Sequence, residues 1–268
     1  MSSFRHVVEK MPSSSSLALA FGAGAAATFV ITLMAKKTKK AKKIRVKYFG
    51  VAATPGEKLR IALCLTVGKD GFEDDRLVKG TWDSLKPKMK YQQLPVLYLD
   101  DVEYHQSGAA LRYIGANLGD GSLYPINDPE ALMKIEEMIG LLEDFQNAWM
   151  PSLYVGMRPA YLGHDPSKWT DEEKAAKIKE MREKFITTAL PKYLGYLSRA
   201  LEEAGDGGFL AGSKISIADC QALPQLNYFT RGVADHVPSD CLNAFPAITA
   251  YLERMKTIPA IKEFMVPK

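Results

Sequence analysis

The stretch "YQQLPVLYLDDVEYHQSGAALRYI", residues 91–114, decides the fold. The apolar run "PVLYLD" predicts a buried strand, Asp100 and Asp101 predict a turn, and "VEYH" predicts a second strand. A helix is predicted to follow from Ser107 to about Leu118. Proline cannot donate to a sheet ladder, so Pro95 marks either a strand's first residue or a special bond geometry. The stretch therefore predicts a strand–turn–strand–helix unit whose entrance is shaped by proline.

The residues upstream complete a small sheet. In "KIRVKYFG", residues 43–50, apolar and polar residues alternate with the period of a half-buried strand, with Tyr48 on the apolar face. "GEKLRIALCLTVG", residues 56–68, predicts a helix, and "FEDDRLVK", residues 72–79, predicts a second strand. The order βαβ followed by ββα is the thioredoxin-like arrangement, which we assign to residues 44–124.

The composition changes after residue 124, and residues 128–268 are predicted to be all-helical. Long amphipathic segments at 129–150, 170–205, 216–232 and 245–265 carry this prediction. Pro191 is expected to break or kink the second segment. Ser216 and Asp219, in "SIAD", form a capping signature for the third, which we interpret as structural.

Residues 1–43 differ from the rest of the chain in how apolar and charged residues are distributed. We expect a tail at 1–16, a single transmembrane helix at 17–35 and a lysine-rich juxtamembrane linker at 36–43. No charged residue lies between Leu17 and Met34, and ~18 helical residues rise ~27 Å, close to the thickness of a thin bilayer. The lysines that follow place the next domain in the cytosol by the positive-inside rule. A cleaved signal or transit peptide, leaving a protein that is soluble in an organelle or secreted, stays open as the alternative.

Charge and cysteine content argue against two other classes of protein, those that bind nucleic acid and those that bind a metal ion. The formal net charge is +4, but the lysine run supplies this excess, so no nucleic-acid partner is predicted. The cysteines Cys64, Cys220 and Cys241 show no metal-ligand spacing. We interpret them as buried reduced thiols and predict no metal site.

Four motifs carry a resemblance to a known family: "VKYFG", "WDSLKPKMKYQQLPVL", "HQSGAALRYIGANLG" and "GSKISIADC". From about Lys43 to its C-terminus the chain resembles the cytosolic glutathione transferases, most closely their sigma class, which includes glutathione-dependent prostaglandin D synthases. The resemblance implies a thioredoxin-like domain that binds glutathione as co-substrate, an all-helical domain, a homodimer and a hydrophobic electrophile as second substrate. It implies a detoxifying transferase, with isomerase or peroxidase chemistry as variants.

The same resemblance implies the site residues. Pro95 is expected to be cis, so that the backbone of Leu94 can pair with the cysteinyl residue of glutathione. Ser107 and Gln106, where a helix begins, are expected to bind the γ-glutamyl carboxylate. The remaining contacts are Trp82, Lys86 and Gln93 for the glycyl end and peptide backbone, and Asp144 for the γ-glutamyl amine bound in the neighbouring subunit.

Tyr48 is the expected catalytic residue. A free thiol with a pKa near 8.5 is only about 3% thiolate at pH 7. A hydrogen bond from a hydroxyl to the sulfur stabilises the anion, and lowering the thiol pKa by about two units takes roughly 2.7 kcal/mol.

Two further expectations concern residues around Tyr48. Arg60 is expected to support the fold. The electrophile pocket is expected to involve Met150, Tyr154, Met157 and Arg158.

The loop after Tyr48, "GVAATPGEKLR", departs from the family pattern. Sigma-class proteins usually carry an arginine where Pro55 and Gly56 stand here. This loss favours the alternative hypothesis, a non-catalytic relative used as a binding or structural module.

Overall fold

A four-stranded sheet organises the first half of the chain. The computed structural model describes residues 43–51 and 54–265, and Ala41–Lys268 form one compact unit. The strands are β1 (Ile44–Phe49), β2 (Glu73–Leu77), β3 (Val96–Leu99) and β4 (Val102–Tyr104). They lie in the order β2-β1-β3-β4, with β1 parallel to β2 and antiparallel to β3, and with β4 antiparallel to β3. The predicted thioredoxin-like sheet is confirmed.

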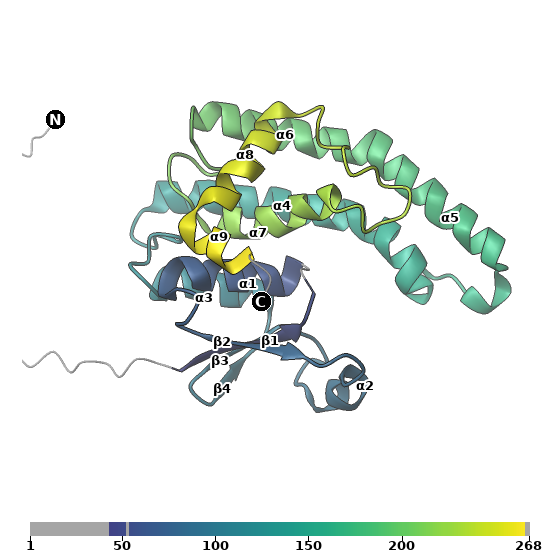
Figure 1. Ribbon diagram of the computed structural model, residues 1–268, viewed down its shortest axis with the longest axis horizontal. Coiled ribbons are helices and arrows are strands. Elements are labelled where there is room, and N and C mark those ends of the chain that lie inside the picture. The colour runs from purple at the N-terminus through teal and green to yellow at the C-terminus, as the bar shows by residue number, and fades with distance from the viewer. Residues whose placement is uncertain (1–42, 52–53, 266–268) are drawn as a thin grey trace, which may run out of the picture. The chain divides into compact units, whose positions relative to one another are not determined.

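The two faces of the sheet are covered differently. Val46 lies opposite Leu97 in the β1–β3 register. Both side chains belong to the large hydrophobic cluster that the sheet shares with the helices, which we call the main core. Val96 and Tyr98 alternate to the other face, where they pack with Met89. Helices α1 (Thr54–Val67) and α3 (Ser107–Asn117) cover the main-core face, between the sheet and the helical half (Figure 1). The strand period thus explains both cores.

The second half is helical, as predicted. The sheet half contributes one more short helix, α2 (Trp82–Leu85), which the sequence did not predict. The helical half contains α4 (Pro129–Met157), α5 (Asp171–Lys184), α6 (Leu190–Ala204), α7 (Ile217–Asn227), α8 (Pro246–Thr257) and α9 (Pro259–Met265). Residues 217–226 of α7 are all buried, and α7 packs on both α1 and α4. The buried α7 therefore joins the sheet half to the helical half.

Prolines bear on the predicted bounds of two helical segments, and only the first of these segments departs from its prediction. The helix expected at 129–150 continues through Pro151 to Met157. Pro191 does accompany the predicted interruption, because a π-helical turn at Phe185–Ala189 separates α5 from α6. Proline has no N–H for the carbonyl four residues earlier, which is that of Thr187. In this π-helical turn, the Thr188 hydroxyl donates a hydrogen bond to the carbonyl of Lys184, the last residue of α5, at 2.6 Å.

The cysteine prediction holds in part. All three are free, and Cys64 and Cys220 are buried, but Cys241 is only partly buried.

Among the described residues, no helix combines the length and apolar character needed to cross a membrane. The predicted tail, anchor and linker lie outside the described residues, apart from Lys43. The boundaries 44–124 and 128–268 stay predictions.

Candidate active site

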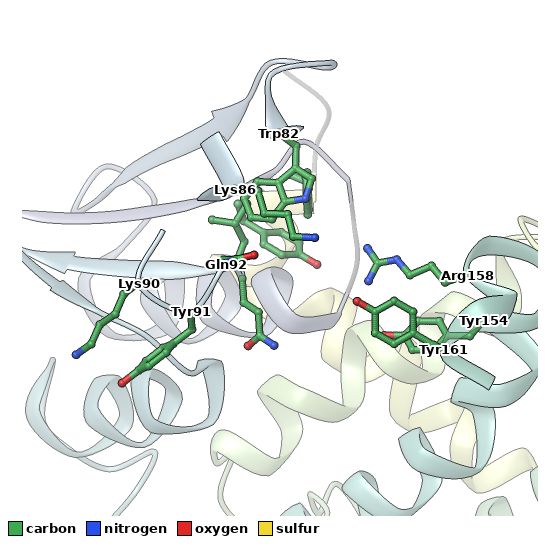
Figure 2. Close-up of a pocket in the computed structure, with 12 residues that line it drawn as sticks. Trp82, Lys86, Lys90, Tyr91, Gln92, Tyr154, Arg158 and Tyr161 are labelled. Carbon is green, nitrogen blue, oxygen red and sulfur yellow. The ribbon is translucent and has the colours of Figure 1, made fainter. Parts of the chain in front are cut away.

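A cavity of about 630 Å³ opens beside Tyr48. Its size is within the ~300–1,000 Å³ typical of small-molecule sites. Figure 2 shows its two facing walls, with Trp82 and Lys86 on one side and Tyr154, Arg158 and Tyr161 on the other. One wall comes from the sheet half and the other from the end of α4 and the turn after it. The lining residues are Tyr48, Phe49, Trp82, Lys86, Lys90, Tyr91, Gln92, Gln93, Leu94, Tyr154, Arg158 and Tyr161.

Tyr48 lies near the end of β1 and is only 6% exposed. Its ring packs edge-on against Phe49, with centroids 5.2 Å apart. Gly56, in the first turn of α1, makes this position possible, because a Cβ there would lie 2.1 Å from Tyr48 Cδ1. Burial raises the pKa of Tyr48 to about 12, and the charges of Arg60 and Arg158 oppose the rise in part. The phenol is therefore protonated at neutral pH and can donate a hydrogen bond into the cavity.

Arg60 fixes the backbone next to Tyr48. Its side chain is fully buried and pairs with Asp74 at 2.7 Å and with Glu57 at 3.3 Å. It also donates to the carbonyl of Phe49 at 3.1 Å. One buried guanidinium thus joins α1, β1 and β2, which agrees with the expected supporting role.

A second hollow of about 180 Å³ adjoins the first. The peptide bond between Leu94 and Pro95 is cis, as expected from the resemblance. Tyr91, Gln93 and Leu94 line both hollows. The second hollow is lined by Pro55, Tyr91, Gln93, Leu94, Pro95, His105, Gln106 and Ser107. All the predicted site residues except Asp144 therefore line one of two adjacent hollows.

The start of α3 is at Ser107, as predicted. Gln106 is the N-cap and Ser107 is the first helical residue. Gln106 has a φ of 70°, a conformation that non-glycine residues seldom adopt and that is concentrated at functional sites. The N–H groups in the first turn of a helix have no partners within the helix. The N-terminus of α3 therefore presents hydrogen-bond donors and the positive end of the helix dipole to the hollow.

Asp144 is not brought together with the other predicted residues. It is exposed on α4 and does not line either hollow. Its predicted ligand belongs to a neighbouring subunit, so this role stays a prediction.

The sequence reasoning missed His105. Its side chain is 6% exposed, it lines the second hollow, and neither ring nitrogen has a hydrogen-bond partner among the described residues. The nearest carboxylate oxygen, of Glu103, lies 3.5 Å from Nε2. Its position directly before Gln106 was the available signal. Phe49, Lys90, Tyr91, Gln92 and Tyr161 were missed as well.

Two of the four residues expected in the electrophile pocket line the main cavity, and their binding role stays a prediction. Tyr154 and Arg158 line the main cavity, facing it from α4 and its C-cap. Met157 is 63% exposed and does not line it. Met150 instead lines a third hollow of about 310 Å³, together with Lys58, Gln221 and Gln225.

Comparisons with known proteins find similar sequences and similar folds. Residues 164–268 match the glutathione S-transferase C-terminal domain. Glutathione S-transferase 2 of Onchocerca volvulus is 28% identical over 82% of this chain and 90% of its own. The chain is related to the glutathione S-transferases.

Two more relatives extend the comparison. A glutathione S-transferase of Anopheles gambiae is 27% identical over 84% of this chain and 96% of its own. Prostaglandin synthase D of Nilaparvata lugens, at 24% identity, superposes with a TM-score of 0.67 over 84% of this chain and 99% of its own. At that identity the superposition shows the shared fold. The fold and the transferase relationship therefore extend well beyond the C-terminal domain match.

Proposed function

We propose that this chain is a sigma-like glutathione transferase that activates the glutathione thiol for attack on hydrophobic electrophiles. One observation carries the proposal: the buried, protonated phenol of Tyr48 lines the same cavity as Leu94, beside the cis Pro95. The neighbouring hollow continues from Leu94 to the first turn of α3.

The glutathione peptide lies across the two hollows. The backbone of Leu94 pairs with the cysteinyl residue, which places the sulfur near Tyr48. The γ-glutamyl carboxylate binds at Gln106 and Ser107, where helix N–H groups favour an anion. Lys86 binds the glycyl carboxylate beside Trp82, with Gln93 contacting the backbone between the ends.

Tyr48 then controls the chemistry. Its hydroxyl donates to the sulfur and stabilises the thiolate, while the thiol proton leaves to solvent. The sulfur's electron pair forms a bond to the electrophilic carbon, and the leaving group departs with its own pair. The same thiolate is the reactive species for isomerase or peroxidase chemistry.

Substituting Tyr48 tests the proposal. In Tyr48→Phe, conjugation of glutathione to 1-chloro-2,4-dinitrobenzene should fall about 10- to 100-fold in kcat/KM, because a donor that stabilises the thiolate by ~2 kcal/mol is lost. The pH profile of kcat/KM should shift upward by one to two units, within the ~2 units that such a donor supplies. Tyr196→Phe, at an exposed tyrosine of α6, is the matched control. Equal rates and profiles in the wild type and Tyr48→Phe would remove the role of Tyr48.

A non-catalytic binding or structural module is the second candidate. Pro55 lines the hollow and Gly56 touches Tyr48, yet neither has a side-chain donor to assist a thiolate. Retention on immobilised glutathione with no conjugation of any tested electrophile would favour this module over the enzyme.

The assembly we propose is a homodimer. Asp144 would reach the γ-glutamyl amine in the neighbouring subunit, consistent with its exposure on α4. Asp144→Asn should raise the KM for glutathione several-fold, whereas Glu137→Gln, on the same helix, should not. A monomeric mass by light scattering would contradict the dimer.

For location, we propose that residues 17–35 anchor the chain in a membrane with the transferase part facing the cytosol. The uncharged segment and the lysines after it support this proposal. Carbonate extraction with sizing of the mature chain is the test. Full release at reduced mass would support a cleaved N-terminus and an organellar or secreted protein.

A further inference from the structure

A cationic aromatic cluster forms the cavity wall opposite Trp82 and Lys86. It consists of Tyr154, Arg158 and Tyr161, with the arginine directed into the space between the walls (Figure 2). The guanidinium carbon lies 5.8 Å from the ring centroid of Tyr154 and 5.7 Å from that of Tyr161. Both contacts are within the range of cation–π interactions.

The backbone holds this cluster in place. Arg158 is the C-cap of α4, and its N–H donates to the carbonyl of Tyr154 at 2.7 Å. Val155 and Pro159, on either side of Arg158, are buried. The guanidinium therefore extends from an anchored helix end.

The charge of the cavity is one-sided. Its charged lining residues are Lys86, Lys90 and Arg158, and no carboxylate of the described chain lines it. Within the same described part, Arg158 forms no ion pair, whereas the buried Arg60 and Arg182 each face a carboxylate. An unpaired guanidinium directed into a cavity is suited to an anion, especially a carboxylate, which its planar fork can bind through two hydrogen bonds.

The three cations have different positions relative to the ligands. Under the proposed function, Lys86 is engaged by the glycyl carboxylate. Lys90 lies beside Tyr91, 5.2 Å from its ring centroid, and points away from Arg158 (Figure 2). Arg158 is thus the cation left for the second substrate.

We propose that the second substrate is a hydrophobic electrophile that carries a carboxylate, bound by Arg158, with its apolar body against Tyr154 and Tyr161. This inference rests on the proposed transferase function. The carboxylate takes no part in the reaction: the C–S bond forms at the electrophilic carbon, and the leaving group departs with its electron pair. Arg158 is a specificity-determining residue in this scheme.

Two aryl chlorides that differ at a single group, a carboxylate in one and its methyl ester in the other, provide the test. The probes are 4-chloro-3-nitrobenzoate and its methyl ester, both conjugated to glutathione with loss of chloride. Rates are divided by the uncatalysed rates with glutathione, which removes the difference in intrinsic reactivity. The proteins are the full-length wild type, Arg158→Gln, Arg158→Lys and Arg199→Gln. Arg199 is a matched control because it is exposed on α6 and lies 5.2 Å from the ring centroid of Tyr196.

Arg158→Gln should lower kcat/KM for the acid about tenfold, mainly through KM, and leave the ester within about twofold. Arg158→Lys should recover part of the loss, because the charge remains and the fork does not. Arg199→Gln should change neither probe. The preference for the acid should weaken as salt is raised.

The failures are distinguishable. Turnover of the ester with equal losses for both probes in Arg158→Gln would overturn the carboxylate inference and leave the transferase function standing. Absence of turnover for both probes and for 1-chloro-2,4-dinitrobenzene in the wild type would overturn both. The affinities of the two purified glutathione conjugates, followed by tryptophan fluorescence, give a readout independent of turnover. Equal affinity of wild type and Arg158→Gln for the acid conjugate would also overturn the inference.

Discussion

Tyr48 and Gly56 leave no room between them, because a Cβ at Gly56 would lie 2.1 Å from Tyr48 Cδ1. The phenol is functional in our proposal only if its hydroxyl reaches the bound sulfur, and Gly56 leaves the space in which the ring lies. A displacement of about 1 Å in a catalytic group can cost about 100-fold in rate. The smallest residue of α1 therefore has a large effect on the site.

Gly56→Ala should lower kcat/KM for conjugation by about 10- to 100-fold, because its Cβ would displace the Tyr48 ring. The fold should survive, since alanine favours a helix over glycine by about 1 kcal/mol. Gly195→Ala, in α6, is the control, because a Cβ there meets nothing within 4 Å. It should leave the rate unchanged. A fully active Gly56→Ala would show that the ring has room to move without loss.

At the scale of elements, the N-terminal cap of the buried helix α7 contributes to the stability of the fold. Asp219, the N3 residue of α7, accepts hydrogen bonds from the N–H groups of Ser216 and Leu210 and from the Tyr251 hydroxyl, at 2.8, 3.0 and 2.9 Å. Glu173 closes a capping box at α5 with Thr170, but on the surface. The two boxes share a pattern and differ in burial.

Asp219→Ala should lower the free energy of unfolding by about 3–5 kcal/mol, because four buried donors, including the Ser216 hydroxyl, lose their acceptor. Glu173→Ala should cost only about 0.5–1 kcal/mol, because water replaces the lost contact. Chemical denaturation of both variants measures the difference. Similar losses in the two would contradict the dependence on burial.

At the scale of the whole molecule, a buried lysine links the sheet half to the helical half. Lys58 of α1 is 8% exposed, and its ammonium donates to Gln221 of α7 at 3.0 Å. Burial lowers the pKa of Lys58 to about 8, although the nearby Glu143 opposes this. The ordinary lysine pKa near 10.4 applies to the unfolded chain.

This difference gives a signed pH dependence. Below pH 8 both states hold the proton, and folding carries the full cost of burying the ammonium. Between about pH 8 and 10.4 the unfolded state binds more protons, so the Lys58 contribution to the free energy of unfolding rises with pH. Lys58→Met should therefore be more stable than the wild type at pH 7, by about 1–3 kcal/mol.

That advantage should shrink or reverse by about pH 10, because neutral Lys58 no longer carries the cost and methionine leaves Gln221 without its donor. Denaturant titrations at pH 7, 8.5 and 10 measure this trend. Lys134→Met, at an exposed lysine of α4, should give a difference that does not vary with pH. A constant difference for Lys58→Met would contradict the burial of a charged lysine.

The sequence alone determined most of the elements and pointed to much of the candidate site. Alternation in residues 44–49 placed Val46 and Tyr48 on the buried face, and "SIAD" placed the start of α7, because strand period and capping are local properties of the chain. The motif resemblance singled out Leu94, Pro95 and Ser107, and the structure places these residues at adjoining hollows. Local pattern did not show that the helix would continue past Pro151 or that α2 would form.

Only the tertiary structure decided what meets in the cavity. Tyr161 is distant in sequence from Tyr48, and nothing in its local pattern distinguishes it from a surface residue, yet both line the cavity. Lys58 looks like any helix-face lysine until α7 covers it, and Asp144 lies on the exposed side of α4. The physical reason is that periodicity and caps satisfy backbone hydrogen bonds within a few residues. A shared cavity instead depends on how elements far apart in the chain pack together.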